Sequence, residues 1–208
     1  PDPSATSLAG TDPLAAETLT AGLLSVMGGG PVPAAPPAVA ARPASRLDEV
    51  KRKLTDPDTR GEVLNVLLGF AAEQFQRVAL FALRDDEAVG LAQAGLDRAG
   101  GPGDEGLREV RVKVAESAWL SALVETRAPV RGPVDGPADT ELVARLGELL
   151  PSEAWLGPVV SGGQVVAFLY GDDLPGGDPL AATDDLESAL AEAGRALDLA
   201  VEQRAKDV

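Results

Sequence analysis

The stretch AWLGPVVSGGQVVAFLYGDD, residues 154–173, decides the fold of this chain. It holds two apolar runs joined by Ser161-Gly162-Gly163, and paired glycines beside a small polar residue are typical of a tight hairpin turn. Two runs joined in this way pair as antiparallel strands. We therefore predict a β-hairpin over these residues and an antiparallel sheet around it.

A second hairpin and a further strand are predicted earlier in the chain. RVALFALR, residues 77–84, is a compact apolar run bounded by Asp85-Asp86, and AVGLAQAGL, residues 88–96, follows after a short polar turn. REVRVKVA, residues 108–115, alternates valines with charged residues, as a strand with one solvated face does. These segments supply further strands of the sheet.

Apolar residues at helical spacing indicate the remaining elements. Helices are predicted over residues 45–54, from Thr59 (at capping-box distance from Glu62) to Phe75, over residues 117–128, after a cap at Asp139, and over residues 183–208. Two hairpins with flanking helices predict an α+β fold, in which helices flank a central antiparallel sheet of about five to six strands.

The residues before this body differ in composition. Residues 1–13 are small, polar and proline-containing and predict a flexible tail, and residues 14–28 predict a short amphipathic helix with Leu19 and Leu23 on its apolar face. Residues 29–44 are rich in proline and alanine and predict an extended linker before a domain at 45–208. Since a short isolated helix is marginal in water, we expect Leu19 and Leu23 to dock in a groove of this domain or of a partner. The alternative is a sparsely ordered remnant between domains of a longer protein.

Composition excludes several classes of site. The 208 residues contain no cysteine and no histidine. Disulfides, thiolate and imidazole metal sites, cysteine nucleophiles and Ser-His-Asp catalysis are therefore excluded. We predict no catalytic residue, no metal site and no cofactor, and we expect that the chain is not an enzyme.

Charge limits the partners. The chain has 33 acidic and 18 basic residues and a net charge of −15, which opposes contact with nucleic acid or an anionic membrane surface. No run of about 18 apolar residues suits a membrane helix, and no basic-then-apolar signal opens the chain. A cytoplasmic protein with protein partners is expected.

The order of elements resembles a GAF-type sensory domain, the α+β fold related to PAS and used in bacterial signalling proteins. The segments that carry the resemblance are GFAAEQF, RVALFALR, AVGLAQAG, ETRAPVRGP and GGQVVAFLYGDD with the long helix that follows. It runs from about Ser45 to the C-terminus and implies a module that binds a small molecule between sheet and helices, or pairs with itself or another protein through its first and last helices. The NKFDE-like motif associated with cyclic-nucleotide binding is not found, and attachment of a bilin through cysteine is impossible.

Two motifs that suggest chemistry have structural explanations. The pair Asp172-Asp173 follows an apolar run but lacks the alternating acids of a calcium loop, so we expect Val165 to Tyr170 to form a buried central strand, Gly171 to turn the chain outward, and both aspartates to be solvated. GPGDEG, residues 101–106, matches a dinucleotide fingerprint formally, but Pro102 removes a donor and a strand rather than a helix is predicted after it. A surface loop is expected there.

Three side chains are candidates for a ligand pocket. Trp119 and Trp155 are the only tryptophans, and both are expected in the inserted region that would cover a GAF pocket. Each could also belong to the core, and the core is the favoured position because both lie within apolar-periodic segments. Arg131 could meet an anionic ligand there, or it could form a surface salt bridge.

The terminal helices are candidates for an interface. The C-terminal helix carries an apolar stripe that includes Leu190, Leu197 and Val201, and the first helix offers Leu47 and Val50. The GAF resemblance implies pairing of terminal helices, so we expect a homodimer through these residues. The leading hypothesis is a noncatalytic regulatory module that acts through protein contacts, and the alternative is a small-molecule sensor with a pocket near Trp119 and Trp155.

Overall fold

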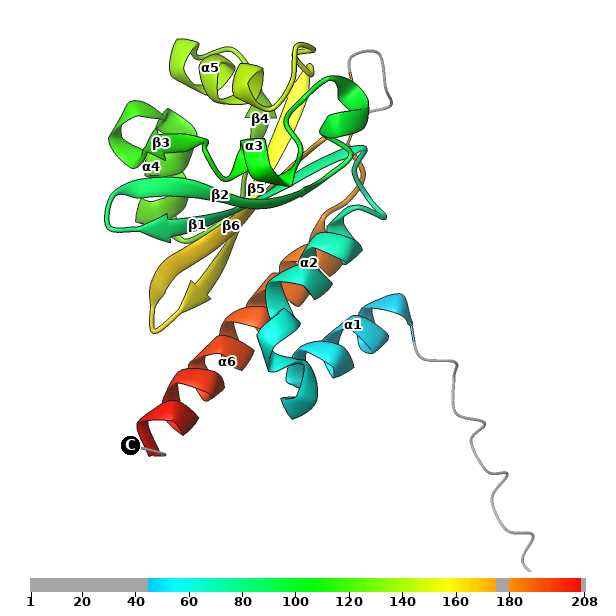
Figure 1. Cartoon of the computed structure of the whole chain (residues 1–208), viewed down its shortest axis with the longest axis vertical. Helices are drawn as coiled ribbons and strands as arrows, with labels where there is room; N and C mark the ends of the chain where they lie inside the picture. Colours follow the sequence, from blue (N-terminus) through cyan, green and yellow to red (C-terminus); the bar gives the residue numbers. More distant parts are fainter. Residues whose placement is uncertain (1–44, 175–179, 207–208) are drawn as a thin grey trace, which may run out of the picture. The chain divides into compact units, whose positions relative to one another are not determined.

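The computed structural model describes residues 45–174 and 180–206 (Figure 1), and the predictions for residues 1–44 lie outside this part of the chain. Six α-helices, six strands and three short 3-10 helices (η) form the described fold. In chain order they are α1 (Arg46–Thr55), η1 (Pro57–Glu62), α2 (Val63–Ala71), β1 (Arg77–Arg84), β2 (Glu87–Ala94), η2 (Asp97–Ala99), α3 (Asp104–Leu107), β3 (Arg111–Lys113), η3 (Val114–Glu116), α4 (Ala118–Thr126), β4 (Val130–Pro133), α5 (Pro137–Arg145), β5 (Glu153–Ser161), β6 (Gln164–Asp172) and α6 (Asp184–Lys206).

The strands form one antiparallel sheet in the order β3-β2-β1-β6-β5-β4. Both predicted hairpins are present, as β1–β2 and β5–β6. Gly162 and Gly163 have φ of 58° and 74° in the β5–β6 turn, a left-handed conformation that glycine adopts without strain. The predicted α+β fold is confirmed, and β6 is a central strand as expected.

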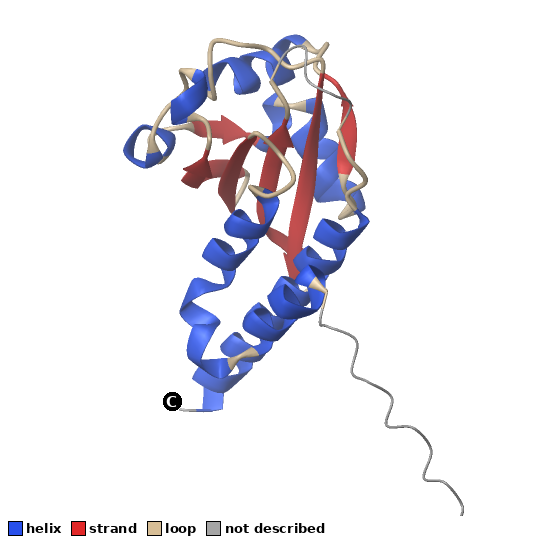
Figure 2. Ribbon diagram, turned by 90° about the vertical axis from the view of Figure 1, so that its right-hand side faces the viewer, coloured by secondary structure: helices blue, strands red, loops and turns tan. Residues whose placement is uncertain are grey.

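Helices cover both faces of the sheet (Figure 2). On one face α1, α2 and α6 pack on a core that includes Leu67, Leu169 and Leu190. On the other face α3, α4 and α5 cover a second core, in which the rings of Phe81 and Phe168 stack with their centroids 4.9 Å apart. Alternate residues of each central strand point to opposite faces, so β1 and β6 are apolar on both sides.

The first helix begins where predicted, at the Ser45 cap, and the second begins later than predicted. The capping box lies at the start of α1, where Ser45 and Asp48 each accept a hydrogen bond from the other's backbone N–H. Thr59 does not begin the second helix, because Asp56 caps a 3-10 turn that starts at Pro57 and α2 begins only at Val63. A proline at the first helical position favours this early turn.

The middle of the chain also departs from expectation. The predicted strand over residues 108–115 is reduced to β3, and the expected loop at residues 101–106 contains the start of α3, whose Leu107 is fully buried. Strand β4 was not predicted. Asp139 does not cap α5, whose N-cap is Gly136. The buried carboxylate of Asp139 instead accepts a hydrogen bond from the hydroxyl of Ser117, the N-cap residue of α4. Because these elements are short, tertiary contacts determine their type and bounds more than the local sequence pattern does.

Candidate functional site

Helix α6 continues beyond the core on which it lies. Its apolar stripe is buried at Leu190, which is 2% exposed, half-buried at Leu197, and open at Val201, which is 63% exposed. From Leu199 onward every residue of the helix except the half-buried Ala200 is exposed. The free end of α6, residues 199–206, therefore continues the apolar stripe to a part of the helix that the described part of the chain does not cover.

The helix is held firmly just before this free end. Gly194 lies against β5, and a Cβ there would overlap the carbonyl oxygen of Val160. One turn later, Asp198 Oδ1 accepts hydrogen bonds from the Ser161 hydroxyl at 2.5 Å and the Gly162 N–H at 2.7 Å. The hydrogen bond from Ser161 is the main cause of a lowered pKa at Asp198. The β5–β6 turn thus fixes where the free end emerges.

A groove of about 370 Å³ lies beside the free end, between α6, α2 and the β1–β2 hairpin. Leu64, Leu91 and Leu197 line it and are each half-buried. The basic side chains of Arg108 and Arg204 also line it. The apolar stripe of α6 and this groove together form one surface, which we call the helix-end surface.

The predicted interface residues differ in how far the domain buries them. Val50 and Leu190 are buried in the domain's own core and offer nothing to a partner, which corrects their prediction as contact residues. Leu47 and Leu197 are half-buried against that core, and Val201 is exposed. Leu19 and Leu23 lie outside the described residues. Periodicity identified the stripe but could not tell which part of it the sheet covers.

The two tryptophans lie on opposite faces of the sheet. Trp119, on α4, is half-buried against the second core, within the inserted region as expected. Trp155 lies on β5 and is 1% exposed, in the core beneath α6, which agrees with the favoured core position and not with a place over a pocket. Its ring stacks on Phe75, with centroids 5.6 Å apart. The structure does not bring Trp119 and Trp155 together.

Arg131 is engaged with protein groups. Its guanidinium forms a two-point ion pair with Glu153 and donates to the carbonyl oxygens of Leu180 and Ala181. The hydrogen bond to Glu153 raises the pKa of Arg131 and lowers that of Glu153. Arg131 therefore ties β4 to β5 and to the segment before α6, and none of its described hydrogen bonds involves Trp119.

Asp172 was predicted to be solvated, but the structure buries it. It is fully buried, and its carboxylate accepts hydrogen bonds from Arg77 Nε at 2.7 Å and Arg77 Nη2 at 2.8 Å, and one from the Tyr170 hydroxyl. Burial raises the pKa of Asp172 against the opposing hydrogen bonds of Arg77 and Tyr170, and burial also raises the pKa of Tyr170. Gly171 does not turn the chain outward; it is a paired strand residue whose missing side chain leaves room for the Phe75 ring.

This buried cluster joins β1 to β6 and is structural. Opposite charges with two parallel hydrogen bonds compensate much of each other's lost hydration. Arg77 Nη1 has no hydrogen-bond partner among the described residues and lies beneath Gly147, where a Cβ would come within 2.8 Å of it. Both charged side chains are fully buried, so neither is exposed to solvent.

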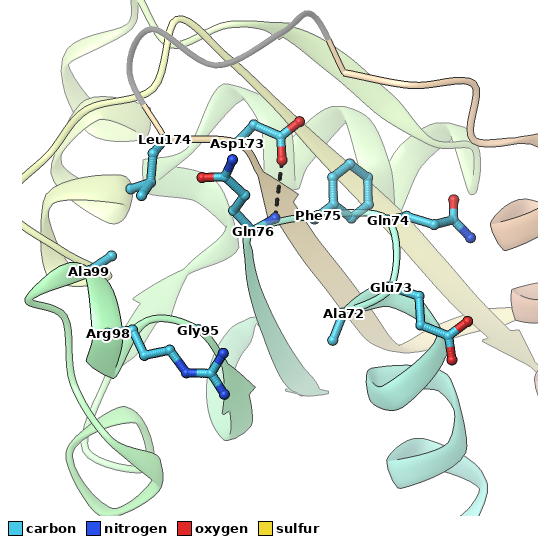
Figure 3. A pocket seen from close by; sticks show the side chains of 10 residues that line it. All are labelled: Ala72, Glu73, Gln74, Phe75, Gln76, Gly95, Arg98, Ala99, Asp173 and Leu174. Atoms are coloured by element: carbon cyan, nitrogen blue, oxygen red, sulfur yellow. Dashed lines mark hydrogen bonds between the residues drawn. The ribbon is translucent and has the colours of Figure 1, made fainter.

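A second cleft lies at one end of the sheet (Figure 3). It measures about 610 Å³ and is formed by the segment between α2 and β1, by η2, and by the residues after β6. Its lining residues are Ala72, Glu73, Gln74, Phe75, Gln76, Gly95, Arg98, Ala99, Asp173 and Leu174. We call it the strand-end cleft. Asp173, unlike Asp172, is partly exposed, and its Oδ1 accepts the Gln76 N–H at 3.0 Å.

Within residues 45–174 and 180–206, no group of three or more acidic side chains is placed to hold a metal ion. No helix in the same ranges is long and apolar enough to cross a membrane.

Comparison with known proteins identifies the fold. No family model and no curated protein matches the chain. Many solved structures do match. The GAF domain of a phosphoenolpyruvate-protein phosphotransferase from Coxiella burnetii shares 17% identity over 78% of this chain and 95% of its own, with a TM-score of 0.56. Residues 45–174 and 180–206 have a GAF-like fold.

Two further structures support this assignment. The second GAF domain of DevS from Mycobacterium smegmatis is 21% identical over 71% of this chain and 99% of its own, with a TM-score of 0.52. Residues 122 to 287 of a methyl-accepting chemotaxis protein are 13% identical over 71% of this chain and 94% of theirs, with a TM-score of 0.55. At such identities the likeness establishes the GAF fold and carries no ligand or partner to this chain.

Proposed function

We propose that this GAF-like domain is a noncatalytic regulatory module that acts through protein contacts, and that its partner is a second copy of the chain bound at the helix-end surface. The observation that carries the proposal is the change in exposure along α6, from 2% at Leu190 to 63% at Val201. Apolar side chains that continue a buried stripe into solvent are stabilised when another surface covers them. The structural likeness to the phosphotransferase GAF domain and to a segment of a chemotaxis protein supports a regulatory role.

The size of a stable interface favours a surface larger than the helix end alone. Such interfaces bury about 1,600 Å² in total, which the last turns of one helix do not supply. The groove lined by Leu64, Leu91 and Leu197 extends the apolar area next to Val201. In a twofold pair, each copy can place its free end on the groove of the other, so the same contact forms twice.

The charges of the last turns suit pairing of two copies. Glu202 is followed by Arg204 and Lys206, and Arg204 and Arg108 line the groove. Two such ends that meet in opposite directions bring Glu202 of one copy near the basic residues of the other. The net charge of −15 opposes this approach over longer distances, so the association is expected to strengthen when salt screens the charge.

The chain offers a matched pair of substitutions as a test. Val201→Asp places a charge on the stripe, and Leu199→Asp places the same charge two residues earlier on the opposite side of the helix, at a residue that is 51% exposed. Because both positions are exposed, neither change disturbs the core. We expect light scattering to give the mass of two chains for the wild type and for Leu199→Asp at high micromolar concentration, and one chain for Val201→Asp.

Two results would reject the proposal. One is a wild-type mass of a single chain at every concentration tested. The other is a dimer that Val201→Asp leaves intact, which would place the contact elsewhere on the domain.

A further inference from the structure

We propose that the strand-end cleft binds a small zwitterion, an α-amino acid or a short peptide, with Arg98 holding the carboxylate and Asp173 holding the ammonium group. The inference goes beyond self-association, because it assigns a ligand class to a site formed by other residues. It also moves the predicted sensor pocket away from Trp119 and Arg131.

The cleft carries two opposite charges on different walls. Arg98 lines it from η2 and Asp173 lines it from the segment after β6, and Figure 3 shows the two side chains on opposite sides of the lining. Arg98 is exposed and forms no ion pair among the described residues. Asp173 Oδ1 accepts the Gln76 N–H, while its Oδ2 makes no hydrogen bond within the described part of the chain.

The third charged side chain of the lining is already neutralised. Glu73 accepts hydrogen bonds from Arg46 Nε at 3.0 Å on both of its oxygens, and this contact lowers the pKa of Glu73. One positive and one negative group therefore remain for a ligand. A simple anion would be repelled by Asp173 and a simple cation by Arg98, whereas a ligand with both charges satisfies the two groups together.

The size and remaining lining of the cleft agree with this class. A volume of about 610 Å³ lies within the roughly 300–1,000 Å³ range of small-molecule sites. Ala72, Phe75 and Leu174 supply apolar contacts for a side chain, and Gln74 and Gln76 add amide groups to the lining. An apolar amino acid such as L-leucine fits these surroundings.

The cleft is coupled to the core beneath α6 by an aromatic contact. Phe75 lines the cleft and stacks on Trp155. A ligand that presses on Phe75 changes the surroundings of the Trp155 indole, so the fluorescence of Trp155 reports on the cleft. In the full chain carrying Trp119→Phe, Trp155 is the only tryptophan.

The experiment removes one charge at a time from the ligand and from the protein. L-leucine and leucyl-leucine keep both charges, N-acetyl-L-leucine lacks the ammonium group, and L-leucinamide lacks the carboxylate. We expect a saturable change in Trp155 fluorescence with L-leucine, leucyl-leucine or both at millimolar concentration. Each single-charge analogue should bind at least about tenfold more weakly than the zwitterions, as expected for loss of a charged hydrogen bond.

Each protein substitution should weaken only those ligands that carry the charge it would otherwise bind. Arg98→Gln should weaken L-leucine about tenfold and leave L-leucinamide unchanged, and Asp173→Asn should weaken L-leucine and leave N-acetyl-L-leucine unchanged. Asp97→Asn, at a residue next to Arg98 outside the lining, is the control and should change nothing. No saturable signal with any zwitterion, or equal binding of all the analogues, would overturn the inference. The oligomeric state is measured separately, so either proposal can fail without the other.

Discussion

Asp198 of α6 holds the turn between β5 and β6 through Ser161, whose hydroxyl donates to Asp198 Oδ1 at 2.5 Å. The same oxygen accepts the Gly162 N–H at 2.7 Å, so one carboxylate fixes both side chain and backbone of the turn. The contact joins the central hairpin of the sheet to the last part of α6 that touches the domain. It therefore sets the position of the free end on which the proposed dimer depends.

Removal of this carboxylate should loosen the end of α6. Asp198→Ala leaves the Ser161 hydroxyl and the Gly162 N–H without their acceptor, so we expect faster amide hydrogen exchange at Gly162 and in the last turns of the helix. Gln203→Ala, on an exposed residue of the same helix outside the apolar stripe, is the control. Unchanged exchange in Asp198→Ala would show that the contact does not hold the helix.

The same contact should depend on pH. The pKa of Asp198 lies below its ordinary value of 3.8 in the folded chain, so the contact contributes stability above that value and loses it as pH falls through the lowered pKa. The difference in thermal midpoint between wild type and Asp198→Ala should therefore be constant near neutral pH and shrink in acid below about pH 4. A difference that stays constant into strong acid would contradict the assignment.

Close packing of α6 on β5 predicts opposite effects for two helical glycines. Gly194→Ala forces a methyl group against the Val160 carbonyl, and we expect a loss of about 1–3 kcal/mol in the free energy of unfolding. Gly69→Ala, on α2 where nothing lies within 4 Å, should instead stabilise by roughly 0.5–1 kcal/mol through helix propensity. Denaturant unfolding of both variants measures this, and equal effects would argue against the close approach.

The buried pair of Arg77 and Asp172 should be strongly coupled. Asp172→Leu or Arg77→Met alone leaves a charge buried without its partner, at a cost of about 3–5 kcal/mol. The double variant buries neither charge, so we expect it to be less destabilised than the sum of the single variants. A double-mutant cycle measures the coupling, and additive losses would show that the pair acts as two independent groups.

The sequence predicted those features that repeat locally. Paired glycines at 162–163 and apolar runs identified both hairpins, and stripe periodicity identified α6. It missed contacts that join distant segments: Asp198 and Ser161 are 37 residues apart, and Arg77 and Asp172 are 95 apart. No local pattern marks such partners. For the same reason periodicity placed Leu190 and Val201 in one interface, although the sheet covers only the first.

Sedimentation equilibrium of the wild-type chain at about 0.1 M and about 1 M NaCl is the most direct test of the proposed self-association. We predict a reversible equilibrium between one and two chains, with a larger fraction of two-chain species at the higher salt concentration, because screening reduces repulsion between two copies that each carry a net charge of −15. A single-chain mass at both salt concentrations, up to high micromolar protein, would contradict the account.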